Sequence, residues 1–198
     1  MVSGQSWRIV CSALVLAICG ASCAKKPPPL DDFGPLPEFS LTDHKGRTVT
    51  HGDLTGRVSI VNFVFTRCPT VCPTVSMKMK KVQERTAKHG SALRIYSISV
   101  DPEYDTPERL NAFASKFSAD PERWRFLTGD KSLIEDQLVK TAKLALETQG
   151  SFDDGTPNIV HGTHFLLIDQ KRHIRGYYNS DTAERLDDLV RDSALLLD

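Results

Sequence analysis

The segment that most constrains the fold is an apolar run that leads directly into two cysteines and then into a helix. Residues 58–65 are continuous, apolar and rich in β-branched side chains, which is typical of a strand covered on both faces. Cys68 and Cys72 follow, and Pro73 suits the first turn of a helix that we expect to extend to His89. Two thiols are therefore expected at a strand-to-helix junction, where a chain can hold a soft metal or a reversible disulfide.

Patterns typical of strands and helices alternate along the rest of the chain. The expected strands are 39–42, 48–50, 58–65, 93–100, 124–127, 165–168 and 174–178, and the expected helices are 73–89, 106–117, 132–144 and 182–197. This order predicts an α/β fold with a mixed central sheet flanked by helices and an N-terminal β-hairpin. Crossover helices make the middle strands parallel. A cysteine pair that ends the first long strand is the arrangement of the thioredoxin-like fold.

The N-terminal residues are expected to be an export signal of the lipoprotein type. Arg8 precedes the apolar run 9–20, which is too short for a membrane span of about 20 residues. Small residues come just before Cys23, so we expect cleavage before Cys23 and lipid on its thiol. An uncleaved membrane anchor and simple secretion are the alternatives. All three place the folded part outside the cytoplasm, in the cell envelope, anchored to a membrane and facing the periplasm if the anchor is kept.

Composition and proline content divide the chain into three predicted parts. Residues 1–22 are expected to be the signal peptide, 23–37 a proline-rich linker that favours extended, unpacked chain, and 38–198 one domain. Lys plus Arg equals Asp plus Glu, at 25 each, so nothing indicates a nucleic acid partner. The basic residues that cluster between 78 and 88 are expected to form a solvated helix face.

The cysteine count leaves one pair for chemistry. Of the five cysteines, Cys11 and Cys19 would leave with the signal and Cys23 would be acylated. In an oxidising compartment, the remaining two nearby thiols tend to form a disulfide. A Cys68–Cys72 disulfide closes almost no loop and would restrict the unfolded chain little. The pair is therefore expected to be a working site rather than a structural staple.

The spacing of the cysteines is compatible with both redox chemistry and metal binding. A four-residue step on a first helical turn places the Cβ atoms about 5–6 Å apart, which permits a disulfide or a shared metal. Thioredoxin-type dithiols have two intervening residues, whereas here there are three, and no second cysteine pair completes a zinc site. Two thiolates and one softer-than-oxygen ligand suit copper(I).

Histidine is the expected third ligand, and two of the six histidines are favoured. His161 and His164 both open the predicted strand 165–168. Since side chains alternate along a strand, only one of them is expected to meet the cysteines. The pattern alone does not choose between them. The other four are expected to be surface or satisfied residues.

Three blocks of the sequence resemble the Sco/SenC family, from about Gly34 to the C-terminus. The blocks are 65–74 (FTRCPTVCPT), 99–107 (SVDPEYDTP) and 160–169 (VHGTHFLLID). The resemblance implies a membrane-tethered, thioredoxin-like copper protein whose ligands for Cu(I) or Cu(II) are Cys68, Cys72 and His161. It also implies that Asp101 lies near the site, unless this aspartate merely ends a strand.

The role implied by the resemblance is that of a metallochaperone. Such proteins deliver copper, or electrons, to the binuclear copper site of cytochrome c oxidase during its assembly. The implied partners are the copper-bearing oxidase subunit or another copper client, a thiol reductant protein and the membrane. The alternatives are an envelope thiol–disulfide oxidoreductase and a copper-homeostasis or redox-sensing protein. A peroxidase, which needs an arginine beside its cysteine, is disfavoured because Arg67 is expected to face solvent.

Overall fold

The strands form one large sheet, built mainly from apolar, β-branched segments, and a separate hairpin. The computed structural model describes residues 1, 29–69, 71–140, 146–151, 157–161 and 163–197, and it describes their side chains except at 146–148 and 157–161. The strands are β1 (Ser40–Asp43), β2 (Thr48–Thr50), β3 (Val58–Val64), β4 (Leu93–Ser99), β5 (Trp124–Thr128), β6 (Leu146–Ser151), β7 (Pro157–His161), β8 (His164–Ile168) and β9 (Ile174–Asn179). Seven of them form the central sheet, in the order β2-β1-β5-β4-β3-β8-β9.

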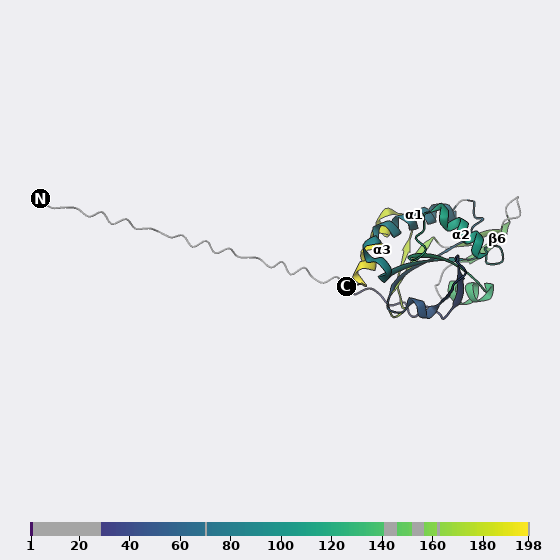
Figure 1. Ribbon diagram of the computed structural model, residues 1–198, viewed down its shortest axis with the longest axis horizontal. Helices are drawn as coiled ribbons and strands as arrows, with labels where there is room; N and C mark the ends of the chain where they lie inside the picture. Colours follow the sequence, from purple (N-terminus) through teal and green to yellow (C-terminus); the bar gives the residue numbers. More distant parts are fainter. Residues whose placement is uncertain (2–28, 70, 141–145, 152–156, 162, 198) are drawn as a thin grey trace.

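Helices cover both sides of this sheet. The helices are η1 (His51–Leu54), α1 (Val71–Arg85), η2 (Ala87–Ala92), α2 (Pro107–Lys116), η3 (Leu133–Val139) and α3 (Ala183–Leu195). Figure 1 shows α1, α2 and α3 along one side of the sheet, with η1 and η3 on the other. The expected start of α2 is confirmed, because the Thr106 hydroxyl accepts a hydrogen bond from the Arg109 N–H and Pro107 occupies the first turn.

The sheet is mixed, as the sequence predicts. β3, β4 and β5 run parallel, with Val58 opposite Leu93 and Ile95 opposite Trp124. β1 pairs antiparallel with β5 and with β2, β8 with β3, and β9 with β8. The expected N-terminal hairpin is therefore present, and the arrangement around β3 is thioredoxin-like.

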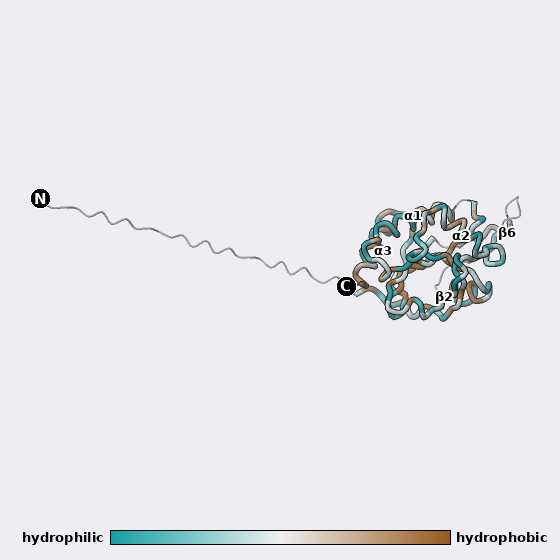
Figure 2. The backbone as a smooth tube through the Cα atoms, in the orientation of Figure 1, coloured by the Kyte–Doolittle hydropathy of each residue, from teal (hydrophilic) through white to brown (hydrophobic). Residues whose placement is uncertain are grey.

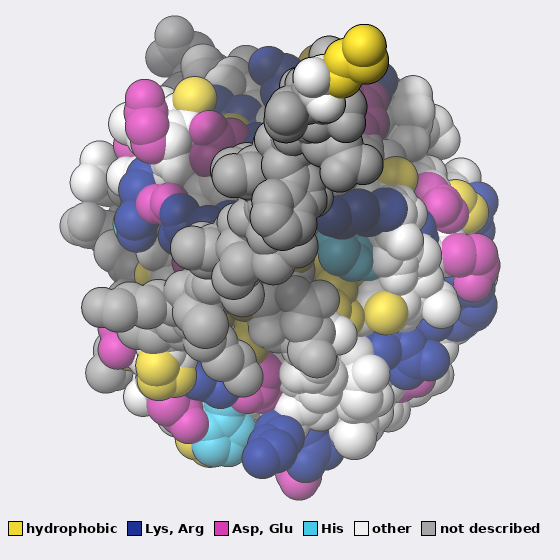
Figure 3. All heavy atoms as spheres, turned by 90° about the vertical axis from the view of Figure 1, so that its left-hand side faces the viewer, with side chains coloured by type: hydrophobic (Ala, Val, Ile, Leu, Met, Phe, Trp, Pro, Cys, Tyr) yellow, Lys and Arg dark blue, Asp and Glu magenta, His cyan; other side chains and the backbone are white. Residues whose placement is uncertain are grey.

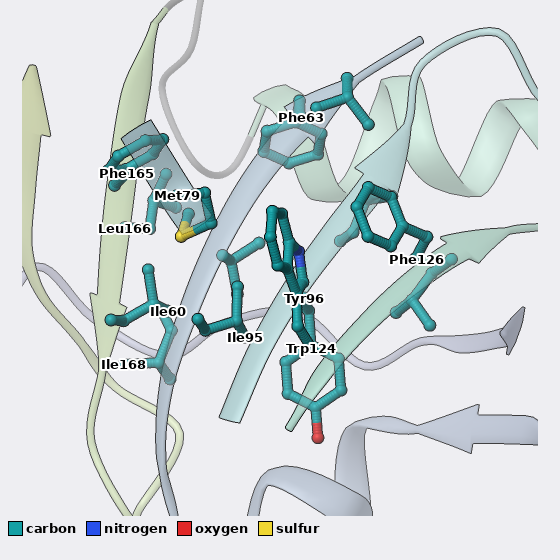
Figure 4. Packing of buried hydrophobic residues seen from close by; sticks show 14 of the residues in the cluster. Ile60, Phe63, Met79, Ile95, Tyr96, Trp124, Phe126, Phe165, Leu166 and Ile168 are labelled. Carbon is teal, nitrogen blue, oxygen red and sulfur yellow. The ribbon is translucent and has the colours of Figure 1, made fainter. Parts of the chain in front are cut away.

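Aromatic and aliphatic side chains fill the space between the sheet and the helices. Trp124 and Phe126 of β5 are both buried and stack with ring centroids 5.0 Å apart. Figure 4 shows them beside Phe63, and it shows Met79 of α1 pointing toward Leu166 of β8. Figure 2 shows the same layering, with hydrophobic segments concentrated in the interior strands. Truncating one of these buried aromatic rings to alanine costs about 3–5 kcal/mol, so the sheet that carries the cysteines is firmly held.

Helix α1 begins and ends earlier than expected. The sequence predicts 73–89, whereas the helix spans Val71–Arg85. The guanidinium of Arg123 accounts for the early end, because it donates to the carbonyl oxygens of Gln83 (3.1 Å) and Thr86 (3.0 Å) and thereby satisfies the last turn. Gly90, at φ 53°, then turns the chain toward β4.

Several parts of the chain differ from the expectation. The hairpin of β6 and β7 is not anticipated by the sequence, which is poor in β-branched residues over β6. The expected helix 132–144 is present over Leu133–Val139 as the π-helix η3, and the predicted end at residue 144 lies outside the described residues. The end of the predicted linker 23–37 packs on β9, since the Phe33 N–H donates to the Ile174 carbonyl at 2.9 Å and Leu36 is buried. The division at residues 22 and 37 remains a prediction.

The described surface matches the balanced composition of the chain. On the face in Figure 3, basic and acidic side chains are intermingled and hydrophobic ones are scattered. Within the described ranges, no helix combines the length and the apolar character needed to cross a membrane. The predicted signal peptide and Cys23 lie outside these ranges.

Candidate thiol and metal site

The cysteine pair lies at one edge of the central sheet, where the parallel strands β3 and β4 end; we call this the cysteine edge. A turn after β3 is closed by the Cys68 N–H, which donates to the Phe65 carbonyl at 3.3 Å. Cys72 follows in the first turn of α1 and is completely buried, while Cys68 is only partly buried. The expected strand-to-helix junction is therefore confirmed, with one thiol accessible and the other inside.

The two cysteines contact each other as thiols rather than as a disulfide. The backbone N–H of Cys72 points at the Cys68 sulfur, at 3.4 Å. Negative charge on that sulfur is stabilised there, because the N-terminus of a helix carries partial positive charge. Contact with Cys68 and burial both raise the pKa of the Cys72 thiol far above its ordinary value. The inner thiol is thus kept protonated until metal binding or disulfide formation removes its proton.

A buried carboxylate holds the loop that precedes Cys68. Asp105 is completely buried and accepts hydrogen bonds from the Thr66 N–H (3.0 Å), the Thr66 hydroxyl and the Ser99 hydroxyl (2.6 Å). The Ser99 hydroxyl in turn accepts from the Asp101 N–H at 3.0 Å. Burial raises the pKa of Asp105, although these hydrogen bonds oppose the change. The network joins the ends of β3 and β4 to the start of α2.

Arg67 was expected to face solvent because it lies in a loop, but its side chain turns toward the protein. Its guanidinium forms two hydrogen bonds with Asp101, from Nε at 2.6 Å and Nη2 at 3.1 Å, and it stacks over Tyr104 at 4.4 Å. The hydrogen bond with Asp101 raises the pKa of Arg67. The side chain turns inward because Asp101 offers a nearly buried carboxylate in the geometry that a guanidinium matches. Asp101 is therefore close to the site, through Arg67.

The topology brings the histidine segment to the cysteine edge. β8 runs antiparallel to β3, with Val61 opposite Leu166, so β8 begins where β3 ends. His164 is the first residue of β8, whereas His161 is the last residue of β7 and pairs with Leu146 of β6. The expectation that both histidines open one strand is wrong, because the backbone of His161 pairs outside the central sheet.

Metal ligation itself is not visible in the described residues. The His161 imidazole lies outside the side chains that the structure describes. Among those that it does describe, no three His, Cys, Asp or Glu side chains are gathered closely enough to hold a metal ion. The two cysteines at one junction fit a soft cation, and the topology leads the chain from His161 toward them.

A family model described as SCO1/SenC matches residues 31–194. The chain belongs to the SCO1/SenC family. Similar solved structures include a SCO1/SenC family lipoprotein from Bacillus anthracis, which is 31% identical, has a TM-score of 0.74 and shares 88% of this chain and 99% of its own. This structural similarity and the match to the family model confirm the family expected from the three sequence blocks.

Two other similar solved structures bear on the chemistry of the site. ScoI of Bradyrhizobium japonicum with copper bound is 29% identical, with a TM-score of 0.68, over 80% of this chain and 99% of that one. BsSco, in which a disulfide switch was identified, is a member of the Sco family of cytochrome c oxidase assembly proteins. It is 29% identical, with a TM-score of 0.71, over 84% of this chain and 94% of that one.

The sequence did not anticipate the roles of Asp105 and Ser99. Both stand in the 99–107 block, in which Thr106 caps α2. The available signal was an aspartate directly before the helix cap, in a segment that follows a buried strand.

Proposed function

We propose that this chain is a copper metallochaperone. It binds copper through Cys68, Cys72 and His161 and delivers it, or reducing equivalents, to the binuclear copper site of cytochrome c oxidase during assembly. The observation that carries the proposal is the placement of the two thiols at the cysteine edge, where the Cys72 N–H donates to the Cys68 sulfur at 3.4 Å. Copper bound to ScoI and the membership of BsSco in a family of oxidase assembly proteins support it.

The donor set suits a cargo that must be released. Copper(I) prefers sulfur and accepts three ligands, so two thiolates and one imidazole hold it without enclosing it. Binding displaces the thiol protons, and the ion is lost when the pair is oxidised. Because Cys68 is the more accessible sulfur, an incoming thiolate exchanges for it first, while Cys72 keeps the ion.

Competitive titration of the reduced full chain with copper(I), under anaerobic conditions and with a chromogenic chelator, tests this site. We expect one ion per chain, no tight binding after Cys68→Ser or Cys72→Ser, and an affinity lower by about tenfold or more after His161→Ala. His164→Ala is the matched control and should bind as the wild type does. Equal losses in the two histidine variants, or an unchanged His161→Ala, would exclude His161 as a ligand.

A thiol–disulfide oxidoreductase is the second candidate, favoured by the disulfide switch of BsSco. In this role Cys68 and Cys72 would pass electrons to client cysteines, forming their own disulfide as the client disulfide is reduced. His161→Ala separates the candidates. The chaperone loses oxidase assembly in cells that carry this variant, whereas the oxidoreductase keeps near-normal disulfide reduction.

We further propose that residues 1–22 are a signal peptide and that Cys23 carries lipid, so that the domain faces the periplasm from the membrane. The similarity to a Bacillus anthracis lipoprotein supports this. Mass analysis of the membrane-extracted protein should find a chain that begins at Cys23 with added acyl mass. In cells that carry Cys23→Ser, we expect the chain to be unmodified and to be recovered in the soluble fraction.

A further inference from the structure

The exposed face of α1 carries several basic side chains. Thr74, Lys78, Lys81 and Arg85 follow one another at steps of four, three and four residues, so they lie in a line along the helix. We call this line the α1 basic face. It begins at Thr74, two residues after Cys72, and points away from the core.

The charges on this face are largely uncompensated. Arg85 pairs with Asp187 of α3 at 2.7 Å, but neither Lys78 nor Lys81 pairs with any carboxylate in the described part of the chain. Lys88 continues the positive charge beyond the helix end, and Glu84 is the only acidic residue of α1. The whole chain has no net charge, so this is a local excess.

Helix stability does not explain these residues. Acidic side chains in the first turn stabilise a helix, and α1 has none there. Like charges three residues apart, such as Lys78 and Lys81, disfavour it. A face that only contacts solvent would stabilise the helix more if its charges were mixed. The excess of positive charge is more simply explained by a partner that binds to this face.

Exposed apolar side chains flank the same line. Val71 is 42% exposed and Met77 is 47% exposed, and they are two of the four large hydrophobic residues that the described surface exposes. Apolar contacts beside a charged rim are typical of protein–protein interfaces. Val71 also adjoins Cys72, so a partner seated here reaches the cysteine edge.

We propose that the α1 basic face, with Val71 and Met77, is the surface on which an acidic protein docks to exchange copper or electrons with the cysteine pair. The inference rests on the proposed function and names the chemistry of its partner. Positive charge beside the site steers an acidic partner, which can raise association rates by about 10- to 1000-fold at low salt.

Stopped-flow transfer of copper(I) from the full chain in neutral detergent to the soluble copper-bearing domain of cytochrome c oxidase tests the proposal. The combined variant Lys78→Glu with Lys81→Glu should slow the second-order rate by about tenfold or more at low salt. The difference should shrink as salt screens the charges. Copper affinity should not change. The matched control, Lys45→Glu with Lys171→Glu, alters two exposed turn lysines and the net charge equally, and it should transfer at the wild-type rate.

Photo-crosslinking supplies a readout that does not require transfer. A benzoylphenylalanine at Met77 should crosslink the acceptor, and one at Lys45 should not. Crosslinks at Met77 without transfer uphold the docking surface and overturn the copper delivery of the proposed function. Transfer with no crosslink at Met77, or with equal slowing in both charge variants, overturns the docking surface and leaves the proposed function standing. The absence of both crosslinks and transfer overturns both.

Discussion

Asp105 binds Thr66 through both of its carboxylate oxygens, one to the backbone N–H and one to the hydroxyl. Thr66 stands two residues before Cys68, and Asp105 stands just before α2. The position of the first cysteine is therefore tied to the start of the crossover that joins β4 to β5 through α2. Because Asp105 is completely buried, no water can replace these hydrogen bonds if they are lost.

Removing the Asp105 carboxylate should destabilise the domain. Asp105→Ala leaves the buried Ser99 hydroxyl and the half-buried donors of Thr66 without an acceptor, and each such group costs about 1–3 kcal/mol. We expect a loss of about 2–4 kcal/mol in the free energy of unfolding, measured by urea denaturation. Glu103→Ala, which removes an exposed carboxylate two residues away, should cost under about 1 kcal/mol. Similar losses in the two variants would contradict the role given to Asp105.

The same aspartate should give stability a recognisable pH dependence. Burial raises the pKa of Asp105 in the folded protein above its ordinary value of 3.8. Its contribution is therefore complete below the unfolded pKa and is lost as pH rises through the folded pKa. The free energy of unfolding of the wild type minus that of Asp105→Asn should fall over this window. A difference that is flat or that rises with pH between about 4 and 7 would be inconsistent with this pKa.

The two cysteines should react in a fixed order with an alkylating agent. Cys72 is completely buried and its thiol pKa is raised by contact with Cys68 and by burial, whereas Cys68 is partly exposed. Brief treatment of the reduced folded protein with iodoacetamide should modify Cys68 first. Fragmentation mass spectrometry of the peptide 68–78 locates the label. Both positions should react in urea, and faster labelling of Cys72 in the folded state would refute the assigned burial.

Arg67→Lys should loosen the loop before Cys68. Lysine keeps the charge but cannot form the paired hydrogen bonds with Asp101. The pair is partly exposed, so we expect a loss of at most about 1 kcal/mol in the free energy of unfolding. Faster hydrogen exchange at the Cys68 amide is the more sensitive measurement. Arg109→Lys is the control, since Arg109 also stacks over Tyr104, at 3.9 Å, but does not bond Asp101. Equal exchange in both variants would count against the Arg67–Asp101 pair.

Local signals were sufficient to predict much of the fold. The continuous apolar run before Cys68 identified β3, and the pair Thr106-Pro107 identified the start of α2, because caps and buried strands are specified by neighbouring residues. The α/β order predicted the mixed sheet for the same reason. These local signals were also sufficient to predict that the cysteines lie at a strand-to-helix junction.

Features that depend on distant residues could not be predicted in this way. The end of α1 depends on Arg123, which comes from beyond α2. The inward turn of Arg67 depends on Asp101, and the strand of His161 depends on its pairing with Leu146. Each of these contacts joins segments that come close together only when the sheet has formed. The local pattern around them is the same whether the contact forms or not.

The antiparallel pairing of β3 with β8 has a consequence for how the protein matures. Ile60 of β3 pairs with Leu167 of β8. β3, the strand just before the cysteines, therefore gains this partner only near the end of synthesis. A chain that emerges from its N-terminus first presents Cys68 and Cys72 to the surrounding oxidants while that partner is still missing. A bond formed between them in this interval would have its Cys72 sulfur buried when the sheet closes. The supply of electrons during biogenesis would then determine what fraction of the newly folded molecules can bind a metal. The same supply would matter after folding.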